Sequence, residues 1–487
     1  MLSIKEPRHS GIELNLGALL DRHPELQINQ EEYNINVTAN YGESLTRDEV
    51  LEKFAQHDGA GRPAHLYLHV PLCSYICHFC NYVKKALPKN GREEETLEAW
   101  VSRLIEESKR YLERFDWIGK ARIESIYLGG GTAALMRESQ LGRLLAHIHE
   151  RYNLSHVQEV TLEGNPDNYD RDFVRAIQRL GFNRFSVGVQ SFQDRVTAFT
   201  GRGHDRLASL KAIKVLLDSG DPFNVDMMFG LPYQTPGTVE EDLRTLVELG
   251  VPTITIYRLR NAERHKMGIG NVSVWNVPSV RDKLYKQGLF PSLEETYAMR
   301  EAAVRVLLEF GYQPSPCGWW SRPGTYPGGN IPHVSANKWQ HYHTMLAVGP
   351  GAYGWLTGRR GEVIQTHNET DIAAYVRHLE SQSTPPLSFG RHLQGHQAVA
   401  SALGFAFKAN QPILFDRFAD EYRVDLLREE PYRSVIEDLL EKRLVEVAPT
   451  GRSIRPTLEG EALHEEIISV YIHGRIGSFQ DAVCKRF

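Results

Sequence analysis

The sequence predicts a mixed α/β fold: a partial, partly open barrel of six βα units, then a lid region and a small C-terminal winged-helix-like α+β domain. Three observations predict it. Between about residues 65 and 258, short β-rich runs alternate with amphipathic helical stretches, as they do around parallel sheets. After about residue 260 the alternation stops and a Gly/Pro/Trp-rich segment follows. From about residue 387, helices and a short hairpin take over.

The barrel prediction depends on six β-rich runs and on the helical patterns between them. The runs are His65–Val70, Ile123–Leu128, Glu159–Glu163, Arg184–Val189, Phe223–Phe229 and Thr253–Arg258, and the helical patterns are Glu93–Phe115, Gln140–Tyr152, Asp170–Leu180, Arg206–Ser219 and Thr238–Leu249. Several helical patterns end in Leu-Gly or Ser-Gly, which is typical of a helix C-terminus. Six units are too few for a closed eight-stranded barrel, so we expect a curved, partly open one with its ligands at the carboxyl ends of the strands.

We expect four parts along the chain. They are a polar extension at 1–60 with one helix at Arg47–Gln56, the barrel core at 61–275, a lid and connecting region at 276–385, and the winged-helix-like domain at 386–487. The lid region holds a helix at Leu293–Phe310, the segment PSPCGWWSRPGTYPGGN, and a strand with a tight glycine turn at 346–355. For the last part the patterns predict helices at Gly395–Phe405, Leu414–Tyr422 and Pro431–Lys442, then short strands at Leu444–Val447 and Ile454–Leu458.

Composition narrows the class of protein. The chain has 487 residues, of which 41% are hydrophobic and 24% charged, as in an ordinary globular enzyme. The formal net charge of -5 predicts no bulk attraction to nucleic acid or to an anionic membrane. No apolar run approaches the ~18 residues of a membrane span, and the N-terminus lacks the apolar core of a secretory signal. We therefore expect a cytoplasmic monomer in a reducing environment.

Three of the five cysteines, Cys73, Cys77 and Cys80, fall within eight residues. Thiolates at C-x3-C-x2-C spacing can hold three corners of a four-iron cluster and leave the fourth iron open to a small molecule. Two alternatives stay open. Structural zinc usually takes two separated ligand pairs, whereas this chain has one triplet with His78 as a candidate fourth ligand. Inert buried thiols are the other alternative.

The second β-rich run ends in Gly129-Gly130-Gly131-Thr132. Glycines let a backbone approach a ligand closely, and their exposed amides and carbonyls can bind it. The GGGT segment alone is a weak signal. Its position one strand after the cysteine loop strengthens the prediction of a ligand site.

With these pieces in order, the chain resembles the radical SAM superfamily and, within it, the HemN-like group. Members of that group include oxygen-independent coproporphyrinogen dehydrogenases, heme chaperones, anaerobic heme-degrading methylases and class C radical SAM methylases. The resemblance runs from about Leu66 to Gly354 and more weakly beyond. The matching segments are LYLHVPLCSYICHFCNY, YLGGGT, VTLEGNPD, GFNRFSVGVQSF, the arginine of FTGRGH, NVDMMFGLPYQTPGT and VGPGAYG.

The resemblance implies a [4Fe-4S] cluster on the three cysteines, S-adenosylmethionine on the open iron, and an electron donor such as flavodoxin or ferredoxin. Tyr67, Gly130 and Glu163 match positions near this first nucleotide. The alternative for Glu163 is a surface ion pair. Contacts to a second S-adenosylmethionine match Gly131, Thr132, Gln190, Arg202 and Asp226. The alternative for Arg202 is a solvated helix cap. Arg260 and Tyr353 also match ligand-contacting positions, although the residue types differ.

Two departures from the family pattern bear on the reaction. Coproporphyrinogen dehydrogenases resemble C-x3-C-x2-C-x-C, and this chain has Tyr82 at the position of the fourth cysteine. Ala133 stands after GGGT where many relatives have proline. The first departure puts coproporphyrinogen decarboxylation in doubt and leaves the cluster prediction intact.

The lid segment offers further candidates. Cys317 is a candidate hydrogen-atom donor, and an inert, partly buried thiol is the favoured alternative because no charged neighbour in the sequence lowers its pKa. Five aromatic residues are candidates either for stacking on a flat conjugated substrate or for the core of the lid: Trp319, Trp320, Trp339, Tyr342 and Trp355. His333, His341 and His343 fit no recognised ligand spacing, so packing or proton transfer is favoured over binding of a metal or heme iron.

Together these features predict a radical SAM enzyme that methylates or cyclopropanates an sp2 carbon of a conjugated small molecule with two S-adenosylmethionine molecules. The prediction depends on the second-nucleotide set and on the missing fourth cysteine. Two alternatives stay open: a decarboxylase of the coproporphyrinogen dehydrogenase type and a non-enzymatic heme chaperone.

Overall fold

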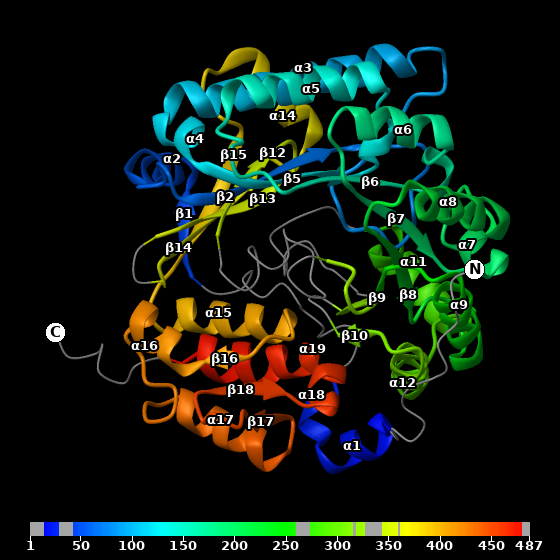
Figure 1. The fold of residues 1–487 in the computed structure, drawn as a ribbon, viewed down its shortest axis with the longest axis vertical. Helices are drawn as coiled ribbons and strands as arrows, with labels where there is room; N and C mark the ends of the chain where they lie inside the picture. The colour runs from blue at the N-terminus through cyan, green and yellow to red at the C-terminus, as the bar shows by residue number, and fades with distance from the viewer. Residues whose placement is uncertain are drawn as a thin grey trace.

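The computed structural model describes residues 14–28, 42–259, 273–314, 318–326, 343–358 and 361–479. Its main feature is a 13-stranded sheet whose centre is the six predicted parallel strands. They are β2 (Pro63–Val70), β5 (Arg122–Gly130), β6 (Glu159–Gly164), β7 (Arg184–Gln190), β8 (Phe223–Phe229) and β9 (Thr253–Arg258). The predicted α/β class with a parallel core is confirmed, and Figure 1 shows the sheet curving without a closed seam.

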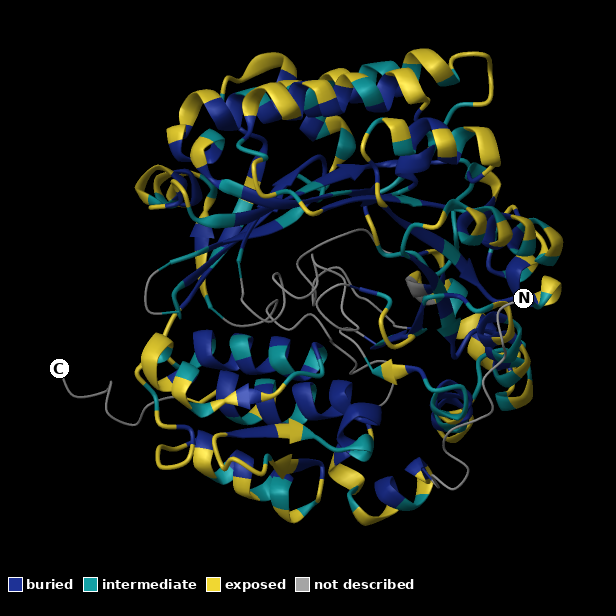
Figure 2. Ribbon diagram, viewed as in Figure 1, coloured by how far each residue is buried: buried dark blue, intermediate teal, exposed yellow. Residues whose placement is uncertain are grey.

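Helices follow these strands. They are α3 (Glu93–Arg114), α4 (Asp116–Lys120), α5 (Glu138–Arg151), α6 (Arg171–Arg179), α7 (Asp194–Phe199), α8 (Arg206–Ser219) and α9 (Pro236–Leu249). All except the short helices α4 and α7 match predicted helical patterns. Both α8 and α9 end in a left-handed glycine, Gly220 and Gly250, which confirms the predicted helix ends. Figure 1 shows α3 and α5 on the outer face of the sheet. In Figure 2 those helices alternate exposed and buried turns while the central strands are largely buried.

The remaining strands of the sheet are β1 (Glu43–Thr46), β10 (Gln313–Pro314), β11 (Trp319–Ser321), β12 (Thr344–Val348), β13 (Tyr353–Thr357), β14 (Val363–Asn368) and β15 (Leu387–Leu393). Of these, the sequence predicted one, the strand before the glycine turn at 346–355, which is β12. β12 pairs in parallel with β2, and β13, β14, β15 and β1 continue the sheet in antiparallel fashion. These pairs join segments far apart in sequence, which a local pattern cannot reveal. The sheet therefore extends well beyond six βα units.

The remaining elements lie before, between and after these strands. They are α1 (Leu16–Arg22), α2 (Arg47–Gln56), α11 (Pro278–Lys286), α12 (Leu293–Glu309), α14 (Ile372–Ser381), α15 (His396–Lys408), β16 (Ile413–Leu414), α16 (Phe415–Tyr422), α17 (Tyr432–Glu441), β17 (Val445–Val447), β18 (Ser453–Pro456), α18 (Leu458–Ala462), α19 (His464–Ile467) and a π-helix at Ile468–Gly477. The predictions of α2, α12, α15, α16, α17, β17 and β18 are confirmed. The sequence did not predict α1, α11, α14, β16, α18, α19 or the closing π-helix. The four-part division of the chain stays a prediction.

None of the helices in the described ranges combines the length and the hydropathy that crossing a bilayer requires.

A buried carboxylate ties the added strands to the barrel. Glu107, on α3, is 0% exposed. It accepts hydrogen bonds from the amide of Gly349 (2.8 Å), from Asn368 Nδ2 (2.6 Å) and from the Tyr375 hydroxyl. Gly349 lies in the turn after β12, so this one side chain fixes the turn against the end of β2. Burial raises the pKa of Glu107 to about 7.

This pKa predicts a pH-dependent contribution to stability. A carboxyl group whose pKa is higher in the folded state stabilises most below its unfolded pKa, about 4.3 for Glu, and that contribution is lost as pH rises toward 7. The difference in melting temperature, wild type minus Glu107→Gln, should therefore decrease as the pH is raised from 5 to 7. Glu113→Gln, at an exposed position of the same helix, controls for the loss of one charge. A pH-independent difference for Glu107→Gln would contradict the assignment.

Candidate functional site

The three cysteines lie in one loop at the carboxyl end of β2. Cys73 is buried in the short strand β3 (Leu72–Cys73), which pairs with β4 (Lys85–Ala86), and Cys77 and Cys80 are half-buried. Lys84 Nζ donates to the carbonyl of Cys80 (2.6 Å), and the amide of His78 donates to the carbonyl of Thr200 (2.9 Å). The loop is thus pinned to the chain just after α7. The sulfurs belong to a fixed, partly accessible loop.

His78 is the candidate fourth zinc ligand. Its Nδ1 lies 3.0 Å from the carbonyl oxygen of Phe199, and its ring packs edge-on against Trp275 at 6.1 Å. These contacts fix the ring against α7 and leave Nε2 as its potential ligand atom. Among the described residues, the group of three potential ligand atoms that lie within 4.8 Å of one another does not include His78, so the structure gives the zinc alternative no support.

The glycine segment after β5 lies directly against the cysteine loop. Gly130 has a φ of +106°, and a Cβ there would meet the His69 ring at 2.5 Å. At Gly131 a Cβ would meet the carbonyl oxygens of Leu72 and Val70 at 2.7 and 2.8 Å, and Cys73 Sγ at 3.0 Å. The first clash involves a buried side chain and the second involves backbone, so neither is easily relieved. Glycine is required here because the loop occupies the space of a side chain.

The predicted first-nucleotide residues come together at the ends of β2, β5 and β6. Glu163 Oε2 accepts from the amide of Gly130 (3.3 Å) and from the Tyr127 hydroxyl (3.4 Å). Burial, with the nearby charge of Asp226, raises the pKa of Glu163 to about 7. This carboxyl group is therefore not a surface ion pair. It is a half-buried acceptor beside the glycine segment, suited to a hydroxyl or ammonium donor of a ligand.

Tyr67 is held in place by a histidine that the sequence analysis did not single out. The Tyr67 hydroxyl lies 2.9 Å from His69 Nδ1, and His69 Nε2 lies 2.8 Å from the carbonyl oxygen of Val83, which follows the cysteine loop. Burial lowers the pKa of His69 to about 4, so the ring is neutral at physiological pH. Since Val83 O can only accept, Nε2 carries the proton and Nδ1 accepts from Tyr67.

Arg202 connects the cysteine loop to the predicted second-nucleotide residues. Its Nη1 lies 3.5 Å from Cys77 Sγ, and its Nη2 donates to Asn165 Oδ1 (2.8 Å) and to the carbonyl of Gly188. Asn165 Nδ2 in turn donates to Thr132 Oγ1 (3.1 Å). Arg202 is therefore part of the site and not a solvated helix cap. Sequence reasoning missed Asn165, although its position directly after β6 placed it at the ligand-binding edge of the sheet.

Gln190 and Asp226 complete that set. Gln190 ends β7 with a φ of +74°, an uncommon conformation for a residue other than glycine and one often found at functional sites. Asp226, on β8, accepts from Ser186 Oγ (3.1 Å) and Asn224 Nδ2 (2.8 Å). Burial raises the pKa of Asp226 to about 6. The site thus holds two half-buried carboxyl groups, Asp226 and Glu163, on strands separated by β7.

The donor set fits an iron–sulfur cluster. Burial raises the pKa of Cys73 to about 12 and also raises that of Cys80. Thiols in this environment ionise only when a metal stabilises the thiolate. Iron bound to the three sulfurs would provide that stabilisation.

The lid candidates are only partly described. Trp320 and Trp355 are buried and belong to the core. Trp319 donates through Nε1 to the Tyr257 hydroxyl at 3.3 Å. The Tyr353 ring lies 4.8 Å from the His367 ring in a tilted arrangement, and Tyr353 packs on the same apolar cluster as Tyr67. Six candidates lie outside the described residues: Arg260, Cys317, His333, Trp339, His341 and Tyr342.

Comparison with known proteins supports the resemblance. The model of the radical SAM superfamily matches residues 67–246, which span Tyr67, the cysteine loop, Glu163, Arg202 and Asp226. Over these residues the chain is similar to the radical SAM superfamily and, within it, to the HemN-like group. A [4Fe-4S] cluster and S-adenosylmethionine are what this similarity implies, and the three cysteines of the loop are the residues we expect to hold the cluster.

Two curated relatives and one solved structure illustrate the likeness. The heme chaperone HemW of Lactococcus lactis is 24% identical over 387 residues, covering 79% of this chain and 91% of that protein. The oxygen-independent coproporphyrinogen III oxidase of Salmonella typhimurium is 25% identical over 263 residues, covering 54% of this chain and 53% of that protein. The structure of coproporphyrinogen III oxidase (HemN) from Escherichia coli superimposes with a TM-score of 0.70 at 18% identity, covering 91% of this chain and 99% of that one, which establishes the fold.

The glycine contacts of this site predict the effect of a single methyl group. Gly131→Ala should lower the iron and sulfide bound per chain after anaerobic reconstitution, because the added Cβ overpacks the cysteine loop. Overpacking of this kind destabilises the folded protein by about 1–3 kcal/mol. Gly142→Ala is the matched control, since a Cβ there meets only Leu180, at 3.5 Å or more. Equal iron contents in the two variants would show that the loop does not need this close approach.

Proposed function

We propose that this chain binds a tetrapyrrole and acts on it by radical chemistry at the cysteine loop. The observation that carries the proposal is the match to 91% of the length of a protein named as a heme chaperone. The second curated relative is named for coproporphyrinogen III, so both names point to tetrapyrroles. The comparisons favour this class of substrate over the peptide or alkaloid-like natural products that the family also includes.

The residues of the site have definable roles in this proposal. When bound at the three cysteines, a reduced [4Fe-4S] cluster supplies the electron that splits S-adenosylmethionine into methionine and a 5′-deoxyadenosyl radical. The half-buried carboxyl group of Glu163 accepts a hydrogen bond from the first nucleotide. Tyr67, oriented by His69, limits the space beside it. Arg202 donates hydrogen bonds next to Cys77, where a ligand carboxylate would suit its planar fork.

A second candidate function is methylation or cyclopropanation of an sp2 carbon with a second S-adenosylmethionine. Two observations favour it. Arg202, Asn165 and Thr132 form a continuous hydrogen-bonded row that starts at Cys77. Tyr82 stands at the position of the fourth cysteine of coproporphyrinogen dehydrogenases, so this position supplies no thiol. The Tyr82 side chain is 62% exposed. The same residue weakens the decarboxylase alternative.

We also propose a cytoplasmic setting and an electron donor of the flavodoxin or ferredoxin class. The support is chemical: a cluster with an open iron is sensitive to oxygen and must be reduced before each cleavage.

The tetrapyrrole proposal is tested with anaerobically reconstituted protein, dithionite and S-adenosylmethionine, in the presence of heme or coproporphyrinogen III. We expect a saturable change in the heme absorbance spectrum and 5′-deoxyadenosine formation that rises several-fold with the tetrapyrrole. Heme binding without any rise in 5′-deoxyadenosine would assign the chain to the carriers and not to the enzymes. Absence of both responses would contradict tetrapyrrole binding.

The two-nucleotide candidate is tested with Arg202→Lys. Lysine keeps the charge and loses the planar fork, so a second nucleotide held by Arg202 should be lost. With a conjugated substrate, S-adenosylhomocysteine should fall by about tenfold or more, equivalent to about 1.4 kcal/mol, while 5′-deoxyadenosine persists and iron content is unchanged. Arg195→Lys, at an exposed arginine stacked on Tyr233, is the control. If the unaltered chain never forms S-adenosylhomocysteine together with 5′-deoxyadenosine, this candidate fails.

A further inference from the structure

Three side chains that can bind a metal lie close together at the amino-terminal ends of three neighbouring strands of the sheet: His65, Glu124 and His343. One potential ligand atom from each lies within 4.8 Å of the other two. His65 and Glu124 lie near the starts of β2 and β5, His343 immediately precedes β12, and these three strands are adjacent and parallel. The cysteine loop follows the opposite end of β2, which is Val70. Val70 lies five residues after His65, and at about 3.3 Å per residue the two are about 16 Å apart along the strand. We propose that His65, Glu124 and His343 bind a divalent transition-metal ion, separate from the iron–sulfur cluster and beyond the function proposed above.

A β-bulge brings the carboxylate into the group. Ala64 pairs with Ile123 and His65 pairs with Ser125, which leaves Glu124 as the extra residue on β5. In a regular ladder Glu124 would face away from the side of the sheet that Ser125 faces. A bulge can re-aim a side chain, and here Glu124 Oε2 lies 3.7 Å from His343 Nδ1.

Neighbouring side chains orient two of the three ligands. Ser125 Oγ lies 2.7 Å from His65 Nδ1, so Nε2 is the nitrogen of His65 that would coordinate a metal. Arg122 Nη2 donates to Glu124 Oε1 at 3.0 Å, while Oε2 faces His343. At metal sites, hydrogen bonds to the non-coordinating nitrogen of a histidine and to one oxygen of a carboxylate orient these ligands toward the metal.

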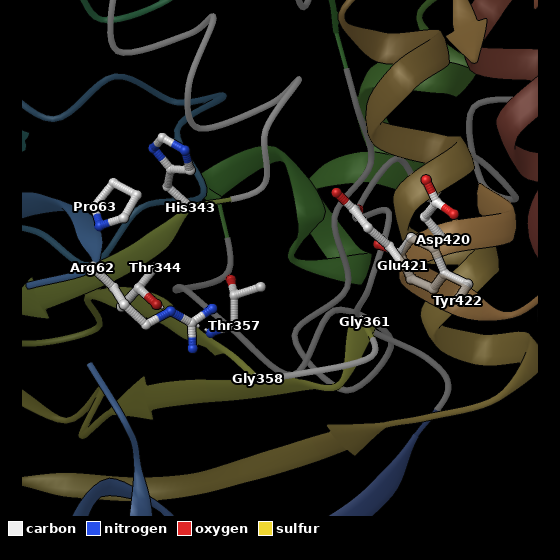
Figure 3. Close-up of a pocket in the computed structure, with 10 residues that line it drawn as sticks. All are labelled: Arg62, Pro63, His343, Thr344, Thr357, Gly358, Gly361, Asp420, Glu421 and Tyr422. Carbon is white, nitrogen blue, oxygen red and sulfur yellow. Dashed lines mark hydrogen bonds between the residues drawn. The ribbon is translucent and has the colours of Figure 1, made fainter. Parts of the chain in front are cut away.

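One of the three residues, His343, also lines a pocket of about 250 Å³. In Figure 3, Pro63, His343 and Thr344 lie on one side of this pocket, and Asp420, Glu421 and Tyr422 of α16 lie on the other. His65 and Glu124 are buried behind this wall. A metal held by the three side chains would therefore lie in the protein interior, next to the wall that His343 forms.

The ligand set selects the class of ion. Two histidines and one carboxylate bind Zn²⁺ in catalytic zinc sites and Fe²⁺ in non-heme iron sites. Ligands at about 2.0–2.1 Å from a tetrahedral zinc lie about 3.4 Å apart, so small rotations of these side chains would close the present spacing. A metal-free alternative is an ion pair between Glu124 and His343, with the His65 ring stacked on the His343 ring at 5.5 Å.

The experiment titrates the full-length, cluster-loaded protein with Zn²⁺ against a chromophoric chelator and records the zinc X-ray absorption edge. We expect one equivalent of Zn²⁺ with only nitrogen and oxygen ligands at about 2.0–2.1 Å. Glu124→Gln and His343→Ala should weaken binding by more than about 100-fold, and Ser125→Ala by about 10–100-fold. His147→Gln, at another buried histidine bonded to a serine, should bind as the unaltered chain does.

Three results would overturn the proposal. The first is a sulfur shell at about 2.3 Å, which would place the zinc on the cysteines. The second is retention of full affinity in both Glu124→Gln and His343→Ala. The third is no binding of either Zn²⁺ or Fe²⁺ beyond the iron of the cluster, which would leave the ion pair as the explanation. In a parallel titration, Fe²⁺ that depends on the same residues and exceeds Zn²⁺ in affinity would support the site and identify its ion.

Discussion

The close approach of the cysteine loop to the glycine segment after β5 is the constraint on which the site depends. The amide of Gly131 donates to the carbonyl of Val70 at 2.7 Å, and there is no space for a Cβ between this glycine and Cys73. Gly130 presents its amide to Glu163 at the same time. One stretch of backbone therefore sets both the position of the cysteines and the position of the half-buried carboxyl group of Glu163. A larger residue in this stretch would separate the two halves of the site.

The far half of the sheet supports the same loop from the other side. A Cβ on Gly349, in the turn after β12, would lie 2.3 Å from the carbonyl oxygen of His69, and Glu107 holds that turn by its amide. His69 in turn connects Tyr67 to Val83, beyond the loop. Stability and function are coupled here, because a buried, readily protonated carboxylate on an outer helix maintains the end of β2. The strands that follow the barrel therefore help to position its ligands.

Local sequence pattern was sufficient where structure is local. The six central strands, the helices between them and the cysteine loop follow from periodicity, glycine ends and spacing. The sequence could not reveal β12 beside β2, because that pairing joins residues about 280 positions apart and loop closure leaves no local signal. Nor could it reveal Asn165 as the bridge between Arg202 and Thr132, or His65 and Glu124 as partners of His343. Those contacts depend on strand order and, for Glu124, on a single bulge. His343 alone matched no ligand spacing because its neighbours come from two other strands.

The central claim is that the four-iron cluster on Cys73, Cys77 and Cys80 has an open iron that binds S-adenosylmethionine. The most direct measurement is the electron paramagnetic resonance spectrum of the anaerobically reconstituted, reduced protein, recorded with and without S-adenosylmethionine. The account predicts a [4Fe-4S]⁺ signal whose g-values shift when the nucleotide is added, and which disappears when the three cysteines are replaced by alanine. A chain with no four-iron signal, or with a signal that the nucleotide leaves unchanged, would contradict it.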